Sequence, residues 1–316
     1  MNRIVHTLLL LLLAATVAPA QESQTDYNFL RLPVSAHVAA LGGDNITIGD
    51  DDPSLIFHNP ALASNVTDRT LNLNFMTYME GTKTASAAFV KAWGQRATWG
   101  AAAQYLDYGS IKQRGIANED LGSFTPKDIA LSGVFSYLLT NRLAGGVTAK
   151  FITSHIAGYN SIAVGVDLGL NYVDDNLGLS LSAVARNLGG QVKAYNDDFE
   201  RIPFDLQLGV SKKLGNAPLR LSGTLTQLNS WKGSKLSDHI VVGADILLSE
   251  QIYVAAGYNF RRAKEMKIAE EEGSSSHGAG LSIGAGLQLQ RFRLQVAYAK
   301  YHVSTASLAF NLSYVL

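Results

Sequence analysis

Residues 292–299 read FRLQVAYA, and this short stretch shows the pattern that decides the fold. Large apolar side chains occupy every second position, and the positions between them are polar or small. Because successive side chains of a β-strand point to opposite faces, the alternation predicts a strand with one apolar face. The same period of two recurs in residues 71–75, 204–211 and 219–226. The chain is therefore predicted to be an all-β protein.

The predicted strands are longer than those of most soluble sheets. They span about 10 to 14 residues, whereas soluble strands average nearer 5 or 6 and a tilted membrane strand needs about 9 to 11. A soluble sandwich also alternates, but the length, and the even count of about fourteen, favour a transmembrane outer-membrane β-barrel. The predicted strands are residues 70–79, 83–93, 97–108, 127–139, 142–154, 159–173, 176–188, 203–213, 217–229, 238–248, 251–262, 276–289, 291–301 and 304–316.

The connections between these strands differ at the two ends of the predicted barrel. At one end they are as short as residues 140–141, and at the other end several are long. Outer-membrane barrels have short periplasmic turns and longer surface loops, so we expect the long connections to face outward. These connections are residues 109–126, 189–202, 230–237 and 263–275.

The composition and the first residues agree with an exported membrane barrel. Lysine plus arginine equals aspartate plus glutamate at 26 each, which gives no indication of a nucleic-acid partner. The chain has no cysteine, which excludes a disulfide-stapled secreted domain. Residues 1–20 combine Arg3, a leucine run and Ala18-Pro19-Ala20, the three parts of a signal peptide. We therefore expect export to the cell outer membrane.

One stretch, residues 32–63, breaks the alternation and reads LPVSAHVAALGGDNITIGDDDPSLIFHNPALA. Asp52 is a good N-cap and Pro53 is favoured at the first helical position, so a short helix is predicted there, ended by Asn59-Pro60. We interpret the stretch as part of a plug inside the barrel. The predicted organisation is a signal peptide at 1–20, an N-terminal lumenal plug at 21–69 and a transmembrane barrel at 70–316.

Charged residues on otherwise apolar strands are predicted to face the lumen. A charge facing lipid near mid-membrane costs about 2–4 kcal/mol, so these side chains must point inward. There they can contact one another and the plug. The residues are Asp167, Asp205, Arg220, Asp245 and Arg293.

Three patterns that could carry chemistry have simpler interpretations. Asp50, Asp51 and Asp52 invite a calcium hypothesis, but no matching ligand spacing follows, so helix caps and lumen contacts are favoured. Gly280 to Gly284 matches the G-x-S-x-G nucleophile motif, but it lies in an alternating strand rather than at a strand-to-helix turn. The histidines lack metal-ligand spacing. We predict no catalysis, no metal and no cofactor.

Residues 27–62 also resemble a known family. The segments YNFLRLPVSA (27–36), AALGG (39–43) and HNPAL (58–62) are similar to the PorV/PorQ family, outer-membrane barrels of the type IX secretion system of Bacteroidota. An Asp-Pro element followed by Asn59-Pro60-Ala61 resembles the hatch of the FadL-like superfamily. The resemblance implies a fourteen-stranded barrel with Asp52, Pro53, Asn59, Pro60 and Ala61 in its plug motif.

The resemblance further implies a role in protein secretion rather than catalysis. The barrel would anchor the surface attachment complex, with a PorZ-like protein as its partner and PorU and PorV in the same complex. Its other contacts would be the lipopolysaccharide leaflet, without nucleic acid or a small-molecule substrate. The alternative is a FadL-like transporter of hydrophobic small molecules. A lumen filled by the plug favours the first function, and a continuous apolar tunnel favours the second.

Overall fold

A computed structural model of the protein describes residues 27–316 apart from 80, 197, 232–233, 267, 271–272, 276–277 and 303–304, and describes no side chains in 268–270 or 273–275. The predicted signal peptide lies outside the described residues, as do residues 21–26 of the predicted plug. Among the described helices, none has the length and apolar character needed to cross a bilayer.

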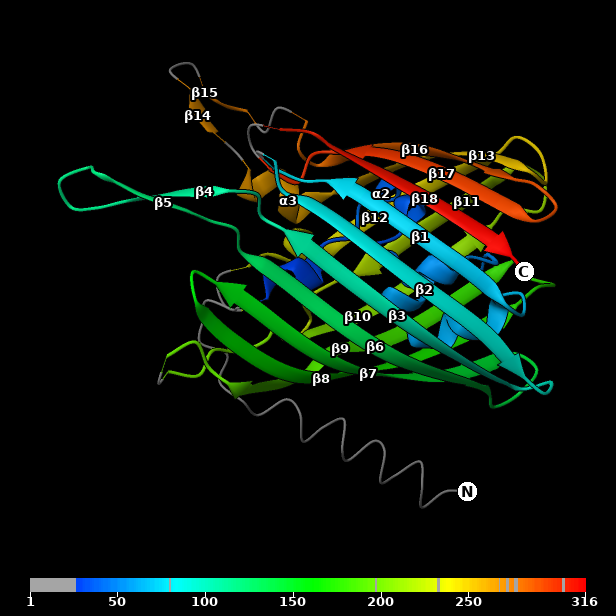
Figure 1. Ribbon diagram of the computed structural model, residues 1–316. Helices are drawn as coiled ribbons and strands as arrows, with labels where there is room; N and C mark the ends of the chain where they lie inside the picture. The colour runs from blue at the N-terminus through cyan, green and yellow to red at the C-terminus, as the bar shows by residue number, and fades with distance from the viewer. Residues whose placement is uncertain are drawn as a thin grey trace.

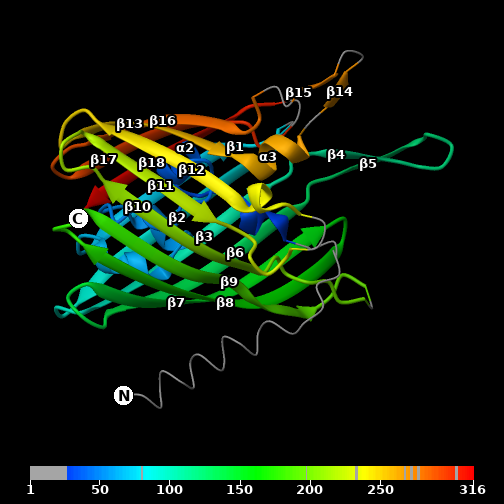
Figure 2. The same cartoon turned by 180° about the vertical axis from the view of Figure 1, so that it is seen from behind.

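Fourteen antiparallel strands close into one barrel, as the alternation predicts (Figures 1 and 2). Apart from the first and last strands, which pair to close the barrel, neighbouring strands follow one another in the chain, and two small hairpins interrupt this order. The barrel strands are β1 (Thr70–Thr77), β2 (Lys83–Trp93), β3 (Ala97–Asp107), β6 (Lys127–Leu138), β7 (Leu143–Ile156), β8 (Tyr159–Asp174), β9 (Leu179–Lys193), β10 (Asp205–Lys213), β11 (Leu219–Leu225), β12 (Ile240–Leu247), β13 (Ile252–Asn259), β16 (Leu281–Gln288), β17 (Phe292–Ala299) and β18 (Ser307–Val315).

The outward face of the barrel is apolar and the inward face is polar or small. On β17, Leu294 and Val296 are exposed while Arg293 and Gln295 are buried. Because the barrel is closed, every strand has two neighbours and no edge of the wall is left unpaired. An outward apolar surface on a closed barrel is the arrangement that a bilayer requires.

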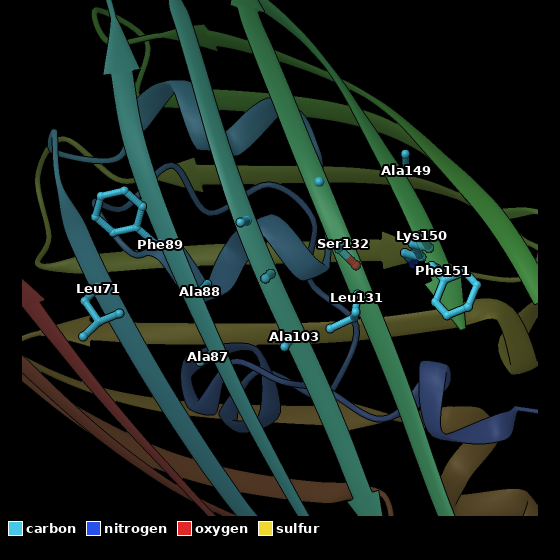
Figure 3. Close-up of a pocket in the computed structure, with 13 residues that line it drawn as sticks. Leu71, Ala87, Ala88, Phe89, Ala103, Leu131, Ser132, Ala149, Lys150 and Phe151 are labelled. Atoms are coloured by element: carbon cyan, nitrogen blue, oxygen red, sulfur yellow. The ribbon is translucent and has the colours of Figure 1, made fainter. Parts of the chain in front are cut away.

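The outward face also carries a shallow apolar groove over β2, β3, β6 and β7 (Figure 3). Its volume is about 660 Å³. Small side chains, among them Ala87 and Ala149, form its floor, and Phe89, Leu131 and Phe151 stand beside them. Since the groove lies on the outside of the wall, it is not part of the lumen.

β18 closes the barrel against β1, with Thr70 opposite Val315 at one end of the seam. Polar side chains on the lumen side of this seam are joined by hydrogen bonds. The Asn72 amide donates to Asn311 Oδ1 at 2.7 Å and to Ser313 Oγ at 3.0 Å. The Asn311 amide in turn donates to Ser54 Oγ at 2.9 Å. The seam is therefore bonded to the N-terminal part of the chain.

Two of the long connections contain secondary structure that the alternation did not predict. Residues 109–126 form a hairpin of β4 (Ile111–Arg114) and β5 (Asp120–Phe124), and residues 263–275 contain β14 (Ile268–Glu270) and β15 (Gly273–Ser275). Both hairpins project from the same end of the barrel (Figures 1 and 2). Both are short, and in the first hairpin Asn118 (φ 63°) and Gly122 of β5 (φ 101°) interrupt the pattern.

The strand predicted over 251–262 ends earlier, at Asn259. The Asn259 side chain accepts a hydrogen bond from the Arg262 backbone N–H, which makes Asn259 the N-cap of α3 (Phe260–Glu265). A cap side chain of this kind competes with the strand ladder, so the last three predicted strand residues are helical. Another turn, η5 (Leu236–His239), precedes β12.

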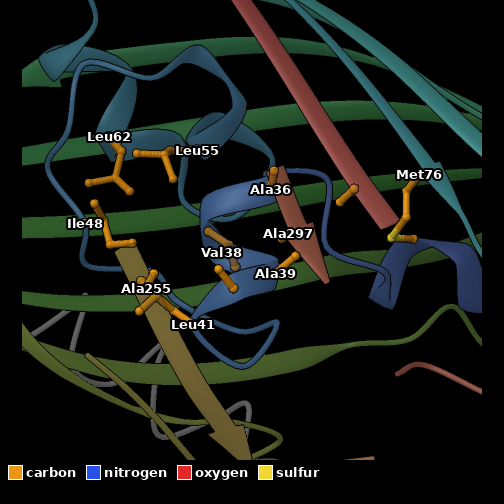
Figure 4. Close-up of a cluster of buried hydrophobic side chains, with 12 residues drawn as sticks. Ala36, Val38, Ala39, Leu41, Ile48, Leu55, Leu62, Met76, Ala255 and Ala297 are labelled. Carbon is orange, nitrogen blue, oxygen red and sulfur yellow. The ribbon is translucent and has the colours of Figure 1, made fainter. Parts of the chain in front are cut away.

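Residues 27–69, here called the N-terminal segment, pack against the inner wall and contain four short helical turns. These are η2 (Asn28–Arg31), α2 (Ala36–Ala40), η3 (Pro53–Phe57) and η4 (Pro60–Asn65). Figure 4 shows the buried apolar cluster in which Val38, Leu41, Leu55 and Leu62 meet wall residues such as Ala297. The core of the protein therefore lies inside the barrel rather than between layers.

Candidate functional site in the barrel lumen

The N-terminal segment runs through the lumen and is bonded to the wall at both ends. Toward the end with long connections, Arg186 Nη2 of β9 donates a hydrogen bond to the Leu30 carbonyl at 3.0 Å. At the end with short turns, the Ala92 N–H of β2 donates to the Asp68 carboxylate at 2.9 Å. Between them, side chains of β3, β6, β9, β16 and β18 also bond to the segment.

The Asn59-Pro60-Ala61 motif lies very close to the wall. Asn59 Oδ1 accepts from the Ala61 N–H at 3.0 Å and caps η4, while its amide donates to the Ile46 carbonyl at 3.0 Å. A Cβ on Gly169 of β8 would lie 2.1 Å from Asn59 Oδ1, and one on Gly146 of β7 would lie 2.4 Å from the Ala61 nitrogen. The motif therefore needs glycine at both facing positions of the wall.

The Asp52-Pro53 element begins η3. The Asp52 carboxylate accepts from the Ser54 N–H at 2.9 Å and from the Ser54 hydroxyl at 2.7 Å, and Pro53 is the first residue of the helix. The neighbouring Asp51 carboxylate accepts two hydrogen bonds from Thr67. Each of these aspartates is bonded within the segment, and no cluster of three acidic or histidine side chains suited to a metal occurs in the described part of the chain.

Four charged or titratable side chains, here called the lumenal charge cluster, join the segment to β11 and β12. Arg220 donates two hydrogen bonds to the Asp50 carboxylate, from Nη1 at 2.7 Å and from Nη2 at 3.0 Å. Its Nε donates to Asp245 Oδ2 at 2.7 Å. His37 Nε2 lies 2.6 Å from Asp245 Oδ1, and His37 Nδ1 lies 3.4 Å from Asp50 Oδ2. His37 and Asp50 come from the segment, and Arg220 and Asp245 come from the wall. The cluster therefore fastens the segment at two points.

The cluster is buried at His37 and Asp245 and partly exposed at Asp50, and its surroundings fix its geometry. His37 is fully buried, and its ring stacks on Tyr253 of β13 with centroids 4.0 Å apart. Burial by itself would raise the pKa of Asp50, but the Arg220 guanidinium outweighs it and holds that pKa well below its ordinary value. Asp50 is therefore ionised, and the attachment is ionic.

A second buried ion pair belongs to the wall alone. Lys150 Nζ of β7 lies 2.7 Å from Asp167 Oδ2 of β8. Asn187 of β9 completes the group, because its side chain accepts from Lys150 at 2.8 Å and its backbone N–H donates to Asp167 at 2.7 Å. Asn187 has a left-handed φ of 57°, close to a register shift between β8 and β9. This group locks an irregular part of the wall.

The structure separates the predicted lumen residues into four places. Arg220 and Asp245 meet in the charge cluster, and Asp167 pairs with Lys150. Asp205 is half-buried and accepts from the Gln227 N–H at 2.6 Å. Arg293 is buried, and its Nη1 has no hydrogen-bond partner among the described residues.

Sequence reasoning missed Asn187 and two of the charged or titratable members of these groups, Lys150 and His37. Lys150 follows the inward phase of β7, so the alternation could have revealed it. His37 lies in the non-alternating segment, where no periodic signal marks the direction of a side chain. Its contact with Asp245 depends on the fold, which places α2 beside β12 and β13.

An apolar cluster lies at the mouth of the lumen, at the end with long connections. Tyr27, Phe29 and Leu30 of the segment are buried there against Leu106, Ala130, Ile152 and Ala163 of the wall and Ile202 of the β9–β10 connection. We call this group the mouth cluster.

Asp44 lies at the same end of the barrel, where the Asn259 amide is 3.5 Å from its carboxylate. Burial, with Asp205 adding to it, raises the pKa of Asp44 to about 6.

The serine of the G-x-S-x-G motif has a structural role. The Ser282 hydroxyl donates to the Ala40 carbonyl at 2.9 Å and accepts from the Gly42 N–H at 2.9 Å. It therefore fixes the turn after α2 to β16.

Comparisons with known proteins identify similar folds but no family related by sequence. No family model matches the chain, and no curated protein matches it. Among solved structures, the chain is similar to the "TodX deltaS2S3 mutant monoaromatic hydrocarbon channel", with a TM-score of 0.59, 13% identity, and coverage of 89% of this chain and 98% of that one. For the "CymD monoaromatic hydrocarbon channel" the TM-score is 0.54, with 13% identity and coverage of 89% and 96%. For a FadL homologue of Pseudomonas aeruginosa it is 0.51, with 12% identity and coverage of 89% and 98%.

The closed wall and its apolar outer face define a β-barrel of the outer-membrane type. Within that class, the chain has the fold of the FadL-like barrels over nearly the whole length of those structures.

Proposed function

We propose that the protein is an outer-membrane channel for hydrophobic small molecules, with the N-terminal segment as its plug. The FadL-like fold supports this proposal, since the similar structures include channels for monoaromatic hydrocarbons. In this proposal residues 1–20 direct export, and the short turns face the periplasm.

The mouth cluster is the observation that carries the proposal. A water-filled porin has a polar lumen, whereas here Leu106, Ile152 and Ala163 face inward and form an apolar wall. Tyr27, Phe29 and Leu30 of the segment cover that wall. When the segment moves, the same side chains offer an apolar site to a small hydrophobic molecule.

A lumen occupied by the segment is the arrangement expected of the anchoring function, so transport through it requires the segment to move aside. The segment fills the space between opposite walls, from β9 near Leu30 to β18 near Ser54. The charge cluster and the Asn59 motif hold it in place. Passage therefore depends on displacement of the segment, in whole or in part.

The chain has no cysteine, so a pair of introduced cysteines gives a clean test. Ser54→Cys with Asn311→Cys places two thiols at positions whose side chains are now hydrogen-bonded across the segment and β18. A short bis-methanethiosulfonate forms a disulfide with each thiol and releases methanesulfinate, and closing this link should stop uptake of radiolabelled toluene or palmitate by intact cells. Reducing the two disulfides with a thiol reductant should restore uptake.

Each single-cysteine variant, treated with the same reagent, is the matched control and should transport normally. If the untreated double-cysteine variant and the wild type take up no more than a strain that lacks the barrel, the channel is refuted. Full uptake with the link closed would refute the plug.

A second function, anchoring of a surface complex in type IX secretion, is favoured by a different observation. Two hairpins, β4–β5 and β14–β15, project from the end of the barrel that carries the long connections. Such arms suit a protein partner more than a solute. The resemblance of residues 27–62 to the PorV/PorQ family agrees with this function, with a PorZ-like protein as the anchored partner.

Deletion of the gene separates the two functions. Loss of a PorZ-like protein from the cell surface, and of cargo attachment, with unchanged hydrocarbon uptake would support the anchor. Reduced uptake with normal cargo attachment would support the channel.

A further inference from the structure

The β4–β5 hairpin stands clear of the barrel wall in both views (Figures 1 and 2). All four residues of β4 are exposed. Large apolar side chains on the arm are exposed as well, with Ile116 at 110% and Leu121 at 54% of their reference areas. A two-stranded hairpin is marginally stable in water by itself. Apolar side chains on an isolated arm therefore indicate a surface that a partner covers.

The two edges of this hairpin are not equivalent. The pairing runs from Ile111 opposite Phe124 and Lys112 opposite Ser123 to Arg114 opposite Asp120, so the extra residue of the bulge lies on β5. Gly122 within that bulge has a φ of 101°, outside the extended region. A bulge of this kind prevents further strand pairing. β4 is regular, and among the described strands it pairs with β5 alone.

The side chains of β4 give its free edge a chemical preference. Lys112 and Arg114 are two residues apart and lie on one face of the hairpin, whereas Ile111 lies on the other face together with Phe124. Arg114 has Asp120 across the ladder, but Lys112 has only Ser123. The edge is therefore basic on one face and apolar on the other.

We propose that β4 is a docking edge for an extended strand of a second protein, one that alternates acidic and apolar side chains. Main-chain hydrogen bonds to residues 111–114 would add this strand to the hairpin. Acidic side chains of the strand would then face Lys112 and Arg114, and its apolar side chains would extend the face formed by Ile111 and Phe124. The inference goes beyond the channel, and it names the binding surface on which the anchoring function would depend.

Synthetic peptides test the edge directly. The probe is a fluorescent eight-residue peptide of alternating glutamate and valine, added to the full-length barrel in detergent and followed by fluorescence anisotropy. It should bind, and hydrogen exchange should slow at amides of residues 111–114 and not in β5. A peptide with alternating lysine and valine should bind at least about tenfold more weakly. A glutamate–valine peptide that is N-methylated at alternate residues should not bind.

Two double variants test the role of charge. Lys112→Glu with Arg114→Glu should weaken binding of the glutamate peptide about tenfold and improve binding of the lysine peptide. The matched control is Lys83→Glu with Lys127→Glu, which reverses two exposed lysines at the same end of the barrel and should leave binding unchanged. Heat-modified mobility on gels verifies that each variant has closed its barrel.

Three results would overturn the proposal: equal binding of the N-methylated peptide, protection of β5 instead of β4, or absence of binding. A Gln113→Cys variant that forms disulfide-linked pairs of barrels in the membrane would also overturn it, because the edge would then belong to a contact between two copies. Hydrocarbon uptake is measured on the same variants. Normal uptake without peptide binding rejects the docking edge alone, and peptide binding without uptake rejects the channel alone.

Discussion

The N-terminal segment meets opposite sides of the barrel in two different ways. Against β11 and β12 it is held by charge, through the two bonds of Arg220 to Asp50 and the contact of His37 with Asp245. Against β2, β3 and β6 it is held mainly by shape, because Ile56, Ala63 and Val66 pack on Ala88, Val90, Ala102 and Val134. Hydrogen bonds from these strands to the segment add to that packing, but no ion pair between these strands and the segment occurs among the described residues. One side is therefore mainly ionic and the other mainly apolar.

This difference explains how a lumenal segment can be held in one position and still be displaced from the wall. Buried ion pairs add little net stability over apolar packing, but breaking one partner is costly, so they fix position more than they add strength. Apolar packing contributes gradually with area and tolerates small shifts. We therefore expect the charged side to set where the segment sits and the apolar side to set how firmly it stays.

The largest effect is expected from Arg220→Met on the charged side. The substitution leaves the buried Asp245 and the partly exposed Asp50 without their cation and should cost about 3–5 kcal/mol. Urea unfolding of the reconstituted barrel gives the measurement. The control is Arg142→Met, which removes a half-exposed arginine from its pair with Asp174 and should cost less than about 1 kcal/mol. Equal losses for the two variants would contradict the cluster's role.

The apolar side is tested by Ile56→Ala. Ile56 is buried among small wall residues that cannot move in to fill the cavity, so the loss should be about 2–4 kcal/mol. The same unfolding measurement applies, with Ile56→Val as the conservative control at about 1 kcal/mol. A loss larger than that of Arg220→Met would reverse the ranking of the two sides.

A smaller effect is expected from Asn59→Ala, which removes the cap of η4 and a hydrogen bond to Ile46. Caps of this type contribute about 0.5–2 kcal/mol. Asn59→Asp keeps the capping oxygen and loses only the donor, so it should fall between the wild type and Asn59→Ala. Proteolysis of the segment in the folded barrel reports the loosening, and identical digestion of all three proteins would show that the cap has no influence.

The smallest effect concerns an ion pair outside the membrane, on the charged side. A hydrogen bond from Lys264 lowers the pKa of Asp238 to about 2. A carboxyl with a depressed pKa contributes stability above its unfolded pKa of about 3.9, and that contribution is lost as the pH falls toward 2. The urea concentrations at the unfolding midpoints of the wild type and of Lys264→Met should therefore differ at pH 6 and converge near pH 2. A constant difference across this range would contradict the assignment.

The sequence predicted the strands of the barrel wall far better than the contacts of the N-terminal segment inside it. A period of two needs only neighbouring residues, and it located all fourteen strands with errors of a few residues at their ends. The hairpin of β4 and β5 was missed because Gly122 and Asn118 interrupt its pattern within a few residues. Inside the barrel, Arg220 and Asp245 could be assigned to the inner face, but their partners His37 and Asp50 are more than 160 residues away in the chain. No local pattern encodes such a pairing.

The row of bonded polar side chains at the β1–β18 seam has a consequence for assembly. If β18 slipped by one residue against β1, Asn311 and Ser313 would point into lipid and apolar neighbours into the lumen. Asn311 also reaches Ser54, so a misregistered closure would leave the segment's η3 without its bond. Closure in the correct register, with the segment inside, is what allows Asn311 to bond both to Asn72 of β1 and to Ser54 of the segment.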